Sequence, residues 1–586
     1  MRTRLLIRML IRIGVLATAT ALAASACGDS GDSASDTTLE GASTTSAVAT
    51  TLTPQAGGVL TVATYQETLG LDPLVSTGGG ITGATEMAAI YDSVTRWNPA
   101  TNQYEPRTAE SLTPNADFTE WTVKIRSGIK FTDGTDYDAD AVKFGVERHL
   151  SGLIPSVPAC EEIRACPRNT VATSSYMGPN VKSVQVVDKL TLKFTMSQSF
   201  PAFPAVLAAP PGMIPSPTAM KAACPADKSK TPRDCSFNLK PVGAGPFMID
   251  EFKPKESITM KKNPGYWNGP VYLDGLKFVG YNDAGADKTY NALKTGTVQL
   301  AYLRSWPELR AAEADKFVGH GNLLNGGVTI LLNNGLTVTC ANGAPPICAG
   351  RPDGAFVPQV STARLKVRQA FAAAIDPVQL DARVFESKGS PGSEFLQKTS
   401  RYYADVAGPK YDVAKAKQLV QEAKAEGWDG KIRWACSNNT YGQQFTLVVQ
   451  SMLQAAGFTV DAKTVDQVSI DVISNRDYES ACWGLSPYSD DLGFWQLFGN
   501  LQGSVASNRM GYKSAAMDSA LATVRAATND DQKKAGYKAM AETYVAEQPL
   551  LVVGALEERA TWNPNVQGVT PSVQTIVHLD KAWIKK

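Results

Sequence analysis

The chain has 586 residues, of which 43% are hydrophobic and 19% charged, and its 57 basic and 56 acidic residues leave a formal net charge of +1 at pH 7. A chain of this length has enough apolar side chains for more than one core, so we expect two lobes or more. Because neither sign of charge dominates, no large electrostatic field attracts nucleic acid or an anionic membrane surface, and we expect no nucleic-acid partner.

The first 26 residues are typical of a secretory leader. Arginines at positions 2, 4, 8 and 12 precede an apolar stretch, Ile13 to Ala24, that is shorter than the roughly 20 residues needed to cross a bilayer. Ala24-Ser25-Ala26-Cys27 is similar to a bacterial lipobox, with Ala24 where leucine is more usual. We therefore expect a lipid on Cys27 and a position on the extracytoplasmic face of the cell membrane. The alternative is an ordinary signal peptide that leaves Cys27 as a free thiol.

Residues 27–56 are mostly Ser, Thr, Ala, Asp and Gly and predict a flexible tether. The first strand is expected at Val59–Thr64, where β-forming residues follow a pair of glycines. No later stretch has about 18 consecutive apolar residues, because five prolines interrupt the nearest candidate, residues 200–215. We expect no transmembrane helix in the mature chain.

The predicted elements after the first strand change in type along the chain. A helix over residues 141–149 follows Asp138, and a β-hairpin over residues 184–194 turns at Asp188-Lys189. Apolar residues at helical spacing predict further helices, which cover residues 362–375, 411–425, 441–456, 515–527 and 531–545. Strands in the first half and helices concentrated in the second predict an α/β architecture of unequal lobes.

Apart from Cys27, the chain has eight cysteines that occur as neighbours along the sequence. An even number outside the cytoplasm predicts disulfides. The expected pairs are Cys160 with Cys166, Cys224 with Cys235, Cys340 with Cys348, and Cys436 with Cys482. The last pair rests only on elimination. The cysteines lack the clustered spacing of a zinc site, and the three histidines are far apart in sequence, so we expect no metal or other cofactor.

The sequence has no catalytic signature. It lacks a nucleophile elbow, the paired histidines of zinc hydrolases and a phosphate-binding loop, so we expect a protein that is not an enzyme. Gly78–Gly83 match a dinucleotide-binding pattern, but no predicted strand precedes them, which favours a plain loop. Asp136, Asp138, Asp140 and Glu147 match calcium-loop positions without the glycine such a loop needs, and Asp138 is better explained as a helix cap.

Several separated motifs agree with one protein family. They are Gly57-Gly58-Val59-Leu60, Leu71-Asp72-Pro73, residues 90–94, residues 118–134, residues 241–247, Asn263-Pro264-Gly265-Tyr266-Trp267, residues 367–376 and Asn508-Arg509-Met510-Gly511-Tyr512. In this order they resemble the family 5 extracellular solute-binding proteins of ABC importers, which include receptors for peptides, nickel and some sugars or opines. Local structure also explains several motifs, such as a turn at Asp133-Gly134 and a sharp bend at Gly243 and Gly245. We expect such motifs to shape the scaffold more than to contact ligand.

The resemblance implies a bilobal α/β fold of the type 2 periplasmic-binding-protein class, with an extra subdomain inserted in lobe one. By analogy, residues 57–90, 243–327 and 554–586 form lobe one, residues 91–242 form the inserted subdomain, and residues 328–553 form lobe two. It also implies a monomeric receptor that encloses a peptide or other small-molecule ligand between its lobes and delivers it to an ABC permease.

Ligand contacts are expected at two places. One is the loop Tyr65-Gln66-Glu67, and the other includes Trp483, Ser486, Tyr488, Asp490 and Asp491. Aromatic side chains there supply contact area, and polar ones match the polar groups of an enclosed solute. The nearby Phe494 and Trp495 are expected to belong to the core.

The position of Ser486 bears on the kind of ligand. Peptide-binding relatives have an aspartate there, which holds the terminal ammonium of the peptide. A buried ammonium without a carboxylate is costly, which favours a neutral or sugar-like solute unless Asp490 or Asp491 has replaced that aspartate. We expect an import receptor for a peptide or a related solute, with a non-peptide solute as the alternative. An extracellular sensor would use the same site, and the missing signatures argue against a hydrolase.

Overall fold

The computed structural model describes residues 52–586 apart from residues 66–67, 69, 75–78, 151–179, 225–234, 281–285, 399, 467, 469–471, 474, 485–490, 492–493, 495–500 and 504–507. The chain divides into a unit of residues 1–53 and a unit of residues 54–586, and the helices and strands given below belong to the second. No helix among the described residues is long and apolar enough to span a bilayer. The expected leader, Cys27 and the Cys160–Cys166 pair lie outside the described residues.

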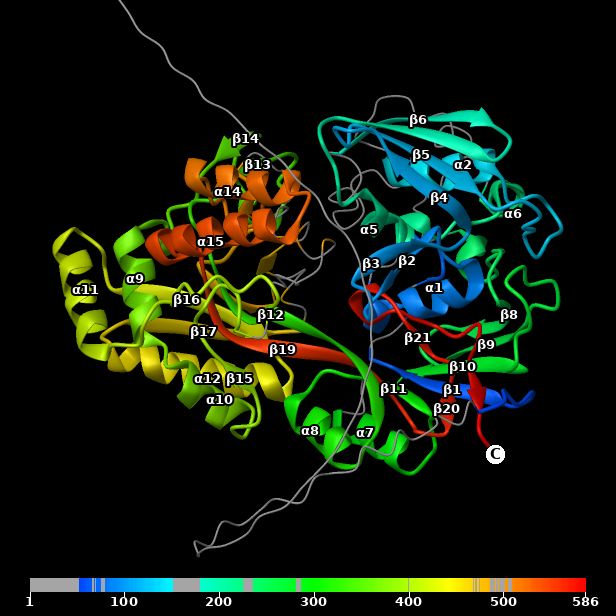
Figure 1. Ribbon diagram of the computed structural model, residues 1–586. Coiled ribbons are helices and arrows are strands. Elements are labelled where there is room, and N and C mark those ends of the chain that lie inside the picture. Colours follow the sequence, from blue (N-terminus) through cyan, green and yellow to red (C-terminus); the bar gives the residue numbers. More distant parts are fainter. Residues whose placement is uncertain are drawn as a thin grey trace, which may run out of the picture. The chain divides into compact units, whose positions relative to one another are not determined.

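A continuous sheet of eleven strands runs through this unit, in the order β17-β16-β18-β12-β19-β11-β1-β10-β9-β8, with β15 (Ser390–Pro391) paired to β19 off this path (Figure 1). The long strands β12 (Val318–Leu332) and β19 (Leu550–Trp562) pair antiparallel at its centre. On one side of them lie β11 (Leu300–Leu303), β1 (Val59–Thr64), β10 (Gly275–Gly280), β9 (Ser257–Lys262) and β8 (Phe247–Lys253). On the other side lie β18 (Ser480–Trp483), β16 (Lys431–Ser437) and β17 (Thr459–Val465).

The sheet has two groups of parallel strands, one on each side of the central β12–β19 pair. β1 runs parallel to β10 and β11, and β16 runs parallel to β17 and β18. Parallel strands are covered on both faces, which explains why every residue of β11 is buried. Helices flank both groups (Figure 1). Beside the first group these are α1 (Ala84–Tyr91), α7 (Ala286–Lys294) and α8 (Trp306–Ala314). Beside the second these are α9 (Leu365–Ala374), α10 (Pro377–Val384), α11 (Val413–Ala425), α12 (Thr440–Ala455), α14 (Ala515–Ala526) and α15 (Asp530–Glu547).

The helices begin close to where the sequence predicts them. Side chains of Asp412, Asn439, Ser514 and Asn529 accept backbone hydrogen bonds at the starts of α11, α12, α14 and α15. The helix expected from Thr362 starts later, because residues 361–363 form a 3-10 turn and α9 begins at Leu365. The Thr362 hydroxyl donates to the carbonyl oxygen of Asn333 at 2.7 Å, which holds this turn against the end of β12.

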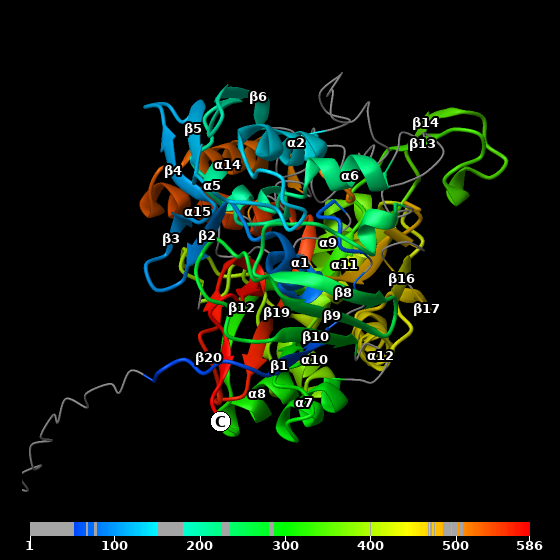
Figure 2. The same cartoon turned by 90° about the vertical axis from the view of Figure 1, so that its right-hand side faces the viewer.

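A second sheet, of four strands in the order β4-β5-β7-β6, lies apart from the large one in both views (Figures 1 and 2). Its strands are β4 (Ala109–Pro114), β5 (Glu120–Ile125), β7 (Thr191–Met196) and β6 (Val181–Asp188), and β6 and β7 form the predicted hairpin. The helix α2 (Ala139–Leu150) packs beside it, and Asp138 Oδ1 accepts the Ala141 amide at 3.1 Å. Asp138 is therefore the predicted helix cap. Asp136 instead binds Lys130 and Lys189.

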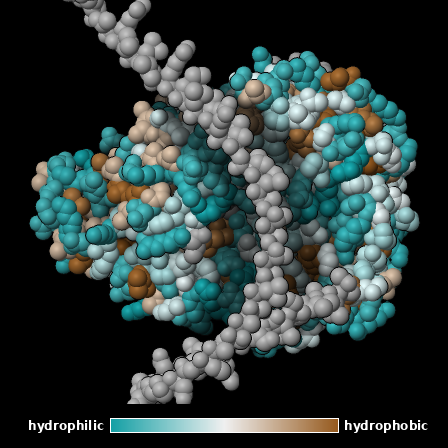
Figure 3. Space-filling model, viewed as in Figure 1, coloured by the Kyte–Doolittle hydropathy of each residue, from teal (hydrophilic) through white to brown (hydrophobic). Residues whose placement is uncertain are grey.

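Four two-stranded sheets complete the described strands. They are β2 (Thr95–Asn98) with β3 (Gln103–Pro106), β13 (Val338–Cys340) with β14 (Gly354–Phe356), β20 (Val566–Gln567) with β23 (Trp583–Ile584), and β21 (Thr570–Pro571) with β22 (Val577–His578). On the face drawn in Figure 3, hydrophobic residues are scattered in small groups among hydrophilic ones. Such scattering is ordinary for a protein surface in water.

Three disulfides lie within the described residues. They are Cys224–Cys235, Cys340–Cys348 and Cys436–Cys482. The first two close loops, whereas the third joins the ends of the neighbouring parallel strands β16 and β18. The third disulfide therefore restrains the residues that follow β18.

Gly243 and Gly245 have a different role from the sharp bend that the sequence suggests. Neither has a positive φ. A Cβ at Gly243 would lie 2.2 Å from the Ile90 carbonyl oxygen, and one at Gly245 would lie 2.5 Å from the Ala89 carbonyl oxygen. Glycine is required at both positions because the backbone passes directly against the end of α1.

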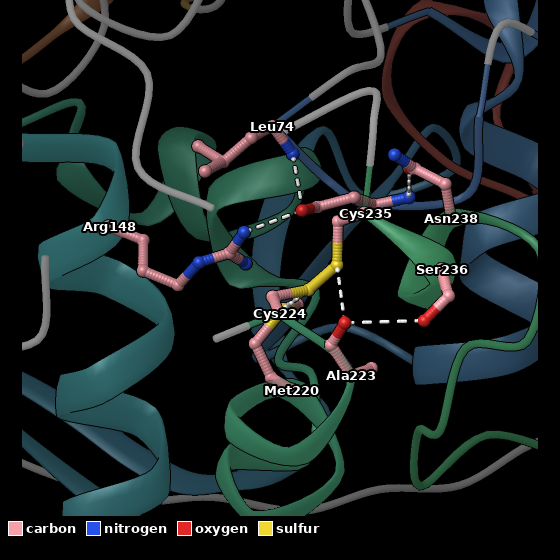
Figure 4. Close-up of a disulfide and its surroundings, with 9 residues drawn as sticks. Leu74, Arg148, Met220, Ala223, Cys224, Cys235, Ser236 and Asn238 are labelled. Atoms are coloured by element: carbon pink, nitrogen blue, oxygen red, sulfur yellow. Dashed lines mark hydrogen bonds and ion pairs between the residues drawn. A yellow bond between two sulfur atoms is a disulfide. The ribbon is translucent and has the colours of Figure 1, made fainter. Parts of the chain in front are cut away.

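A fully buried ion pair connects α2 to the loop after β1. Arg148 Nη2 lies 2.6 Å from Asp72 Oδ2, and both side chains are 0% exposed. The Asp72 amide donates to Asn238 Oδ1 at 2.9 Å, and Asp72 Oδ1 accepts the Leu74 amide at 3.1 Å (Figure 4). The Cys224–Cys235 disulfide lies beside this cluster, at the end of α6 (Pro217–Ala223) (Figure 4). The Leu71-Asp72-Pro73 motif is thus explained by a buried carboxylate that holds two parts of the scaffold together.

We expect Arg148→Met to lower the free energy of unfolding by about 3–5 kcal/mol, because it leaves the Asp72 carboxylate buried without its cation. Urea denaturation at pH 7 measures this loss. Lys124→Met is the matched control, since Lys124 forms an exposed ion pair with Glu110, and its effect should stay within about 1 kcal/mol. Equal effects of the two substitutions would contradict the importance of the buried pair.

Candidate ligand-binding site

The two parallel groups of the large sheet direct their carboxyl ends toward each other. β11 ends at Leu303, which pairs with Arg559 of β19, and Arg559 pairs in turn with Gly321 of β12. β18 ends at Trp483, which pairs with Thr329 of β12. Because β11 and β18 run in opposite directions, their ends approach each other along the stretch of β12 between these pairs. In α/β sheets, ligands bind beyond the carboxyl ends of strands, so this region is the candidate site.

The middle of β12 is irregular at this point. Its register with β19 shifts between Leu324 and Val328 and again before Thr329. A Cβ at Gly327 would lie 2.4 Å from Leu556 Cβ, so a side chain there would not fit against β19. On β19, Gly554 pairs with Val328. Glycines and register shifts let paired strands bend and twist locally, and here both occur between the two parallel groups.

Arg304 connects the ends of β1 and β11 to β19. Its Cζ lies 5.7 Å from the ring centroid of Tyr65, the residue directly after β1. Its Nε lies 3.3 Å from Glu558 Oε1 on β19. Burial raises the pKa of the Glu558 carboxyl, and the charge of Arg304 opposes that rise. The guanidinium is thus held by an aromatic face and a buried carboxylate, while Tyr65 remains 38% exposed.

Trp483, the last residue of β18, and Gly484 after it lie near Arg304. A Cβ at Gly484 would lie 3.5 Å from Arg304 Nη2 and 3.1 Å from the Gly327 carbonyl oxygen. Arg509 Cζ lies 5.7 Å from the ring centroid of Trp483, which is only half-buried. The backbone after β18 therefore lies against Arg304, and the Cys436–Cys482 disulfide restrains the chain two residues before Gly484.

Tyr441, at the start of α12, adds a third aromatic side chain to the region. Burial raises the pKa of its hydroxyl, the charge of Arg304 lowers it, and the phenol of Tyr65 raises it. The Tyr441 ring lies 5.6 Å from that of Phe385 and 5.6 Å from that of Phe445. These two contacts hold the Tyr441 side chain at the start of α12, and the residue remains 36% exposed.

The predicted ligand residues fall into three groups. Tyr65 and Trp483 lie at strand ends that meet at Arg304. Asp491 forms an ion pair with Lys533 on α15, so its charge is already neutralised. The remainder lie outside the described residues, and they are Gln66, Glu67, Ser486, Tyr488 and Asp490.

The prediction that Phe494 belongs to the hydrophobic core is confirmed. Its side chain is buried, and its ring lies 6.5 Å from that of Tyr537 in an edge-on arrangement. Trp495 lies outside the described residues. Among the described residues, no group of three or more His, Cys, Asp or Glu side chains is arranged to hold a metal ion.

Four residues of the site were not indicated by the sequence as ligand contacts, and they are Arg304, Tyr441, Arg509 and Glu558. Arg304 had a usable signal, because it follows the fully buried run Leu300–Leu303 directly, where polar side chains reach the end of a parallel strand. The signal for Glu558 is weaker, because it consists only of a carboxylate inside a largely buried strand. Arg509 belongs to a motif that was assigned to the scaffold.

A buried carboxylate also lies behind the loop that carries Tyr65. Glu86 of α1 is 1% exposed, and its Oε1 accepts a hydrogen bond from Thr68 Oγ1 at 2.9 Å. Burial raises the pKa of Glu86 to about 7, against opposing hydrogen bonds from its own backbone amide and from Thr68. Its protonation state therefore changes in the neutral range, at a contact three residues beyond Tyr65.

A profile described as "Bacterial extracellular solute-binding proteins, family 5 Middle" matches residues 103–504. The glutathione-binding protein GsiB of Shigella flexneri is 25% identical over 451 residues, covering 75% of this chain and 78% of GsiB. A dipeptide-binding protein of Pseudoalteromonas sp. SM9913, solved with Met-Leu, has a TM-score of 0.70 at 20% identity and covers 90% of this chain and 100% of that chain. AgaA of A. tumefaciens R10, solved with agropinic acid, has a TM-score of 0.67 at 23% identity and covers 90% and 99%.

These likenesses define the class of protein. The fold is the bilobal α/β fold of the type 2 periplasmic binding proteins, as the sequence predicts. Within that class the chain belongs to family 5 of the bacterial extracellular solute-binding proteins. The family consists of binding proteins of ABC importers and not of enzymes, which agrees with the missing catalytic signatures.

Glu86 predicts a pH dependence of stability. Its pKa in the folded state is about 7 against an ordinary value of 4.5, so the folded state keeps a proton that the unfolded state releases. The free energy of unfolding should therefore fall as the pH rises from 5 to 8, by about 3 kcal/mol from this group. Glu86→Gln should remove that part of the fall in urea titrations, whereas Glu110→Gln, at an exposed position, should not. Parallel pH curves for wild type and Glu86→Gln would contradict the prediction.

Proposed function

We propose that this chain is the substrate-binding lipoprotein of an ABC importer, tethered to the extracytoplasmic face of the cell membrane through Cys27. It captures a peptide or a related small solute between two lobes and delivers it to a permease. The observation that carries the proposal is the meeting of the β1, β11 and β18 ends around Arg304. Aromatic rings and charged groups gather there, in a protein that belongs to a solute-binding family.

The proposed lobes are those expected from the sequence. Lobe one contains residues 57–90, 243–327 and 554–586, with residues 91–242 inserted, and lobe two contains residues 328–553. The register shift after Gly327 and the Gly554–Val328 pair fall at the proposed boundaries, which supports them. The last segment of lobe one is supported by a hydrogen bond of 3.2 Å, in which the Val577 amide donates to Thr85 Oγ1 of α1.

The proposed mechanism is a change in the population of two shapes. A solute that contacts Tyr65 on one lobe and Trp483 on the other makes its full set of contacts only when the lobes are closed. Closure is then favoured by the contact energy that the open shape lacks. The bend in β12 and β19 is where the lobes can rotate, because a local irregularity in two paired strands deforms more easily than a regular ladder. The permease would recognise the closed shape.

The ligand we propose first is a peptide or a peptide-like conjugate, as the names of GsiB and of the dipeptide-binding protein suggest. A second candidate is a non-peptide solute. It is favoured by Ser486, which replaces the aspartate of peptide-binding relatives, and by the pairing of Asp491 with Lys533. The Asp491 carboxylate would have to leave that lysine to hold a peptide ammonium.

Lipid attachment is tested at Cys27. Cys27→Ala should move the protein from the membrane fraction to the medium or the soluble extracytoplasmic fraction, because the thiol that carries the lipid is lost. Fractionation and immunoblotting measure this, with labelling by radioactive palmitate as a second readout. The proposal is wrong if the variant stays in the membrane fraction as wild type does.

Solute capture is tested by calorimetry on the detergent-solubilised protein with glutathione, Met-Leu and agropinic acid. At least one of these should give heat. Tyr65→Ala should weaken that binding about 10-fold, because the solute loses an aromatic contact and Arg304 loses the ring beside it. Tyr411→Ala is the matched control, since Tyr411 is 47% exposed and precedes α11. Equal affinities for all three proteins would contradict the role of Tyr65.

A further inference from the structure

Arg525, near the end of α14, connects the proposed lobe two to the inserted subdomain. Its Nη2 donates a hydrogen bond to Oδ1 of Asn180, which directly precedes β6 and lies 345 residues away in the sequence. The Gln198 amide, with its oxygen turned toward the guanidinium, accepts hydrogen bonds from both Nη1 and Nη2. In Figure 1, α14 lies with the helices of the second parallel group, whereas β6 belongs to the separate four-stranded sheet. We call the contact of these three residues the Arg525 latch.

The four-stranded sheet holds the acceptor side of the latch in place. Asn180 and Gln198 flank the ends of β6 and β7, where Val181 pairs with Met196. The Ser197 amide donates to the Asn180 carbonyl oxygen at 2.8 Å, and Asn180 is 0% exposed. Gln198 is exposed. The Asn180 acceptor is therefore positioned by backbone pairing, which is independent of the guanidinium that it binds.

The donor side of the latch is mounted on a tightly packed helix pair. A Cβ at Gly536 of α15 would lie 2.5 Å from Val524 Cγ2 and 2.9 Å from the Val524 amide nitrogen, so only glycine allows this approach of α15 to α14. Val524 directly precedes Arg525. Burial lowers the pKa of the Arg525 guanidinium to about 10, so the group stays charged at neutral pH and forms charge-assisted hydrogen bonds.

The same helix pair supports a stretch of the candidate site. Lys533 of α15 forms an ion pair with Asp491, and the Tyr537 ring of α15 lies 6.5 Å from the Phe494 ring in an edge-on arrangement. Both partners belong to the chain that follows β18, whose last residue is Trp483. A movement of α14 and α15 therefore carries the latch and part of this stretch together.

The latch joins two parts of the chain that the proposed mechanism moves apart. Lobe two, residues 328–553, contains α14, and the inserted subdomain, residues 91–242, contains both acceptors. Rotation about the bend in β12 and β19 would separate them and return the guanidinium to water. Hydrogen bonds that exist in only one of two shapes favour that shape by their net free energy.

We propose that Arg525 is a positioning residue for solute capture, which stabilises the closed shape by binding Asn180 and Gln198 and does not itself contact the solute. The proposal rests on the proposed function and gives the inserted subdomain a part in closure. Because the affinity of a receptor scales with the population of its binding-competent shape, loss of the latch weakens binding. The solute leaves only after the latch breaks, so the loss should appear mainly in the dissociation rate.

The experiment removes each side of the latch. Calorimetry on the detergent-solubilised full chain uses glutathione, Met-Leu and agropinic acid, and the variants are then measured with a solute that binds wild type. Arg525→Met should weaken binding about 10-fold, as expected for loss of charge-assisted hydrogen bonds. Arg525→Lys should keep part of the affinity, and Gln198→Ala should lose less than Arg525→Met. Adding Asn180→Ala to Arg525→Met should weaken binding no further, because the two residues act through one contact.

The control is Arg433→Met, which removes an arginine of lobe two that is paired with Asp477 and should leave binding unchanged. An arginine in the last turn of a helix also stabilises that helix. The thermal midpoint of the ligand-free protein separates this role, since it would lower the midpoint and leave the dissociation rate, followed by stopped-flow fluorescence, unchanged.

Wild-type affinity in both Arg525→Met and Gln198→Ala, or losses from Arg525→Met and Asn180→Ala that add in the double variant, would overturn the inference and leave a solute receptor in place. Gln198→Ala keeps the test decisive if Arg525→Met does not fold, because Gln198 is exposed. Absence of heat with every probe in wild type would contradict the proposed function, and the inference with it.

Discussion

The antiparallel pairing of β12 with β19 is the constraint on which the rest of the structure depends. It runs from the pair Val318–Trp562 to the pair Leu331–Leu550, and it is the central seam between the two parallel groups of strands. Because β11 is registered on β19 and β18 on β12, this single ladder determines that their carboxyl ends meet. A slip of one residue would turn every side chain of a strand to the opposite face, so the position of Arg304 beside Tyr65 and Gly484 depends on that register.

The irregular middle of this ladder has both a structural and a functional consequence. A regular antiparallel pair of this length would be stiff, whereas the close approach at Gly327 and the register shift beside it interrupt the hydrogen-bond pattern. The charged groups of the site lie close to that interruption. Arg304, after β11, is paired with Glu558 on β19, and the Arg509 guanidinium lies over the Trp483 ring at the end of β18. The same few residues would therefore be affected both by a solute and by rotation of the lobes.

The sequence predicted the local elements of the fold well, because their causes are local. Asp138, Asp412 and Asn439 cap helices, and the strand Val59–Thr64 follows a glycine pair. The resemblance of several motifs to one family then predicted the bilobal fold class. Of the residues at the candidate site, the sequence indicates Tyr65 and Trp483 but not Arg304, Glu558 or Tyr441, and its ligand residues stay a prediction. Arg304 and Glu558 are more than 200 residues apart in the sequence and meet through strand register, which no local pattern contains. Gly243 and Gly245 are a similar case, because the helix end that requires glycine there is distant in sequence.

A crystal structure of the protein with the solute that it retains from its host tests the central claim most directly. The account predicts electron density for a bound molecule beyond the carboxyl ends of β1, β11 and β18, in contact with Tyr65 on one side and Trp483 on the other. Density for the solute elsewhere, with this region filled only by water, would contradict the claim that the β12–β19 seam brings these strand ends together to form the binding site.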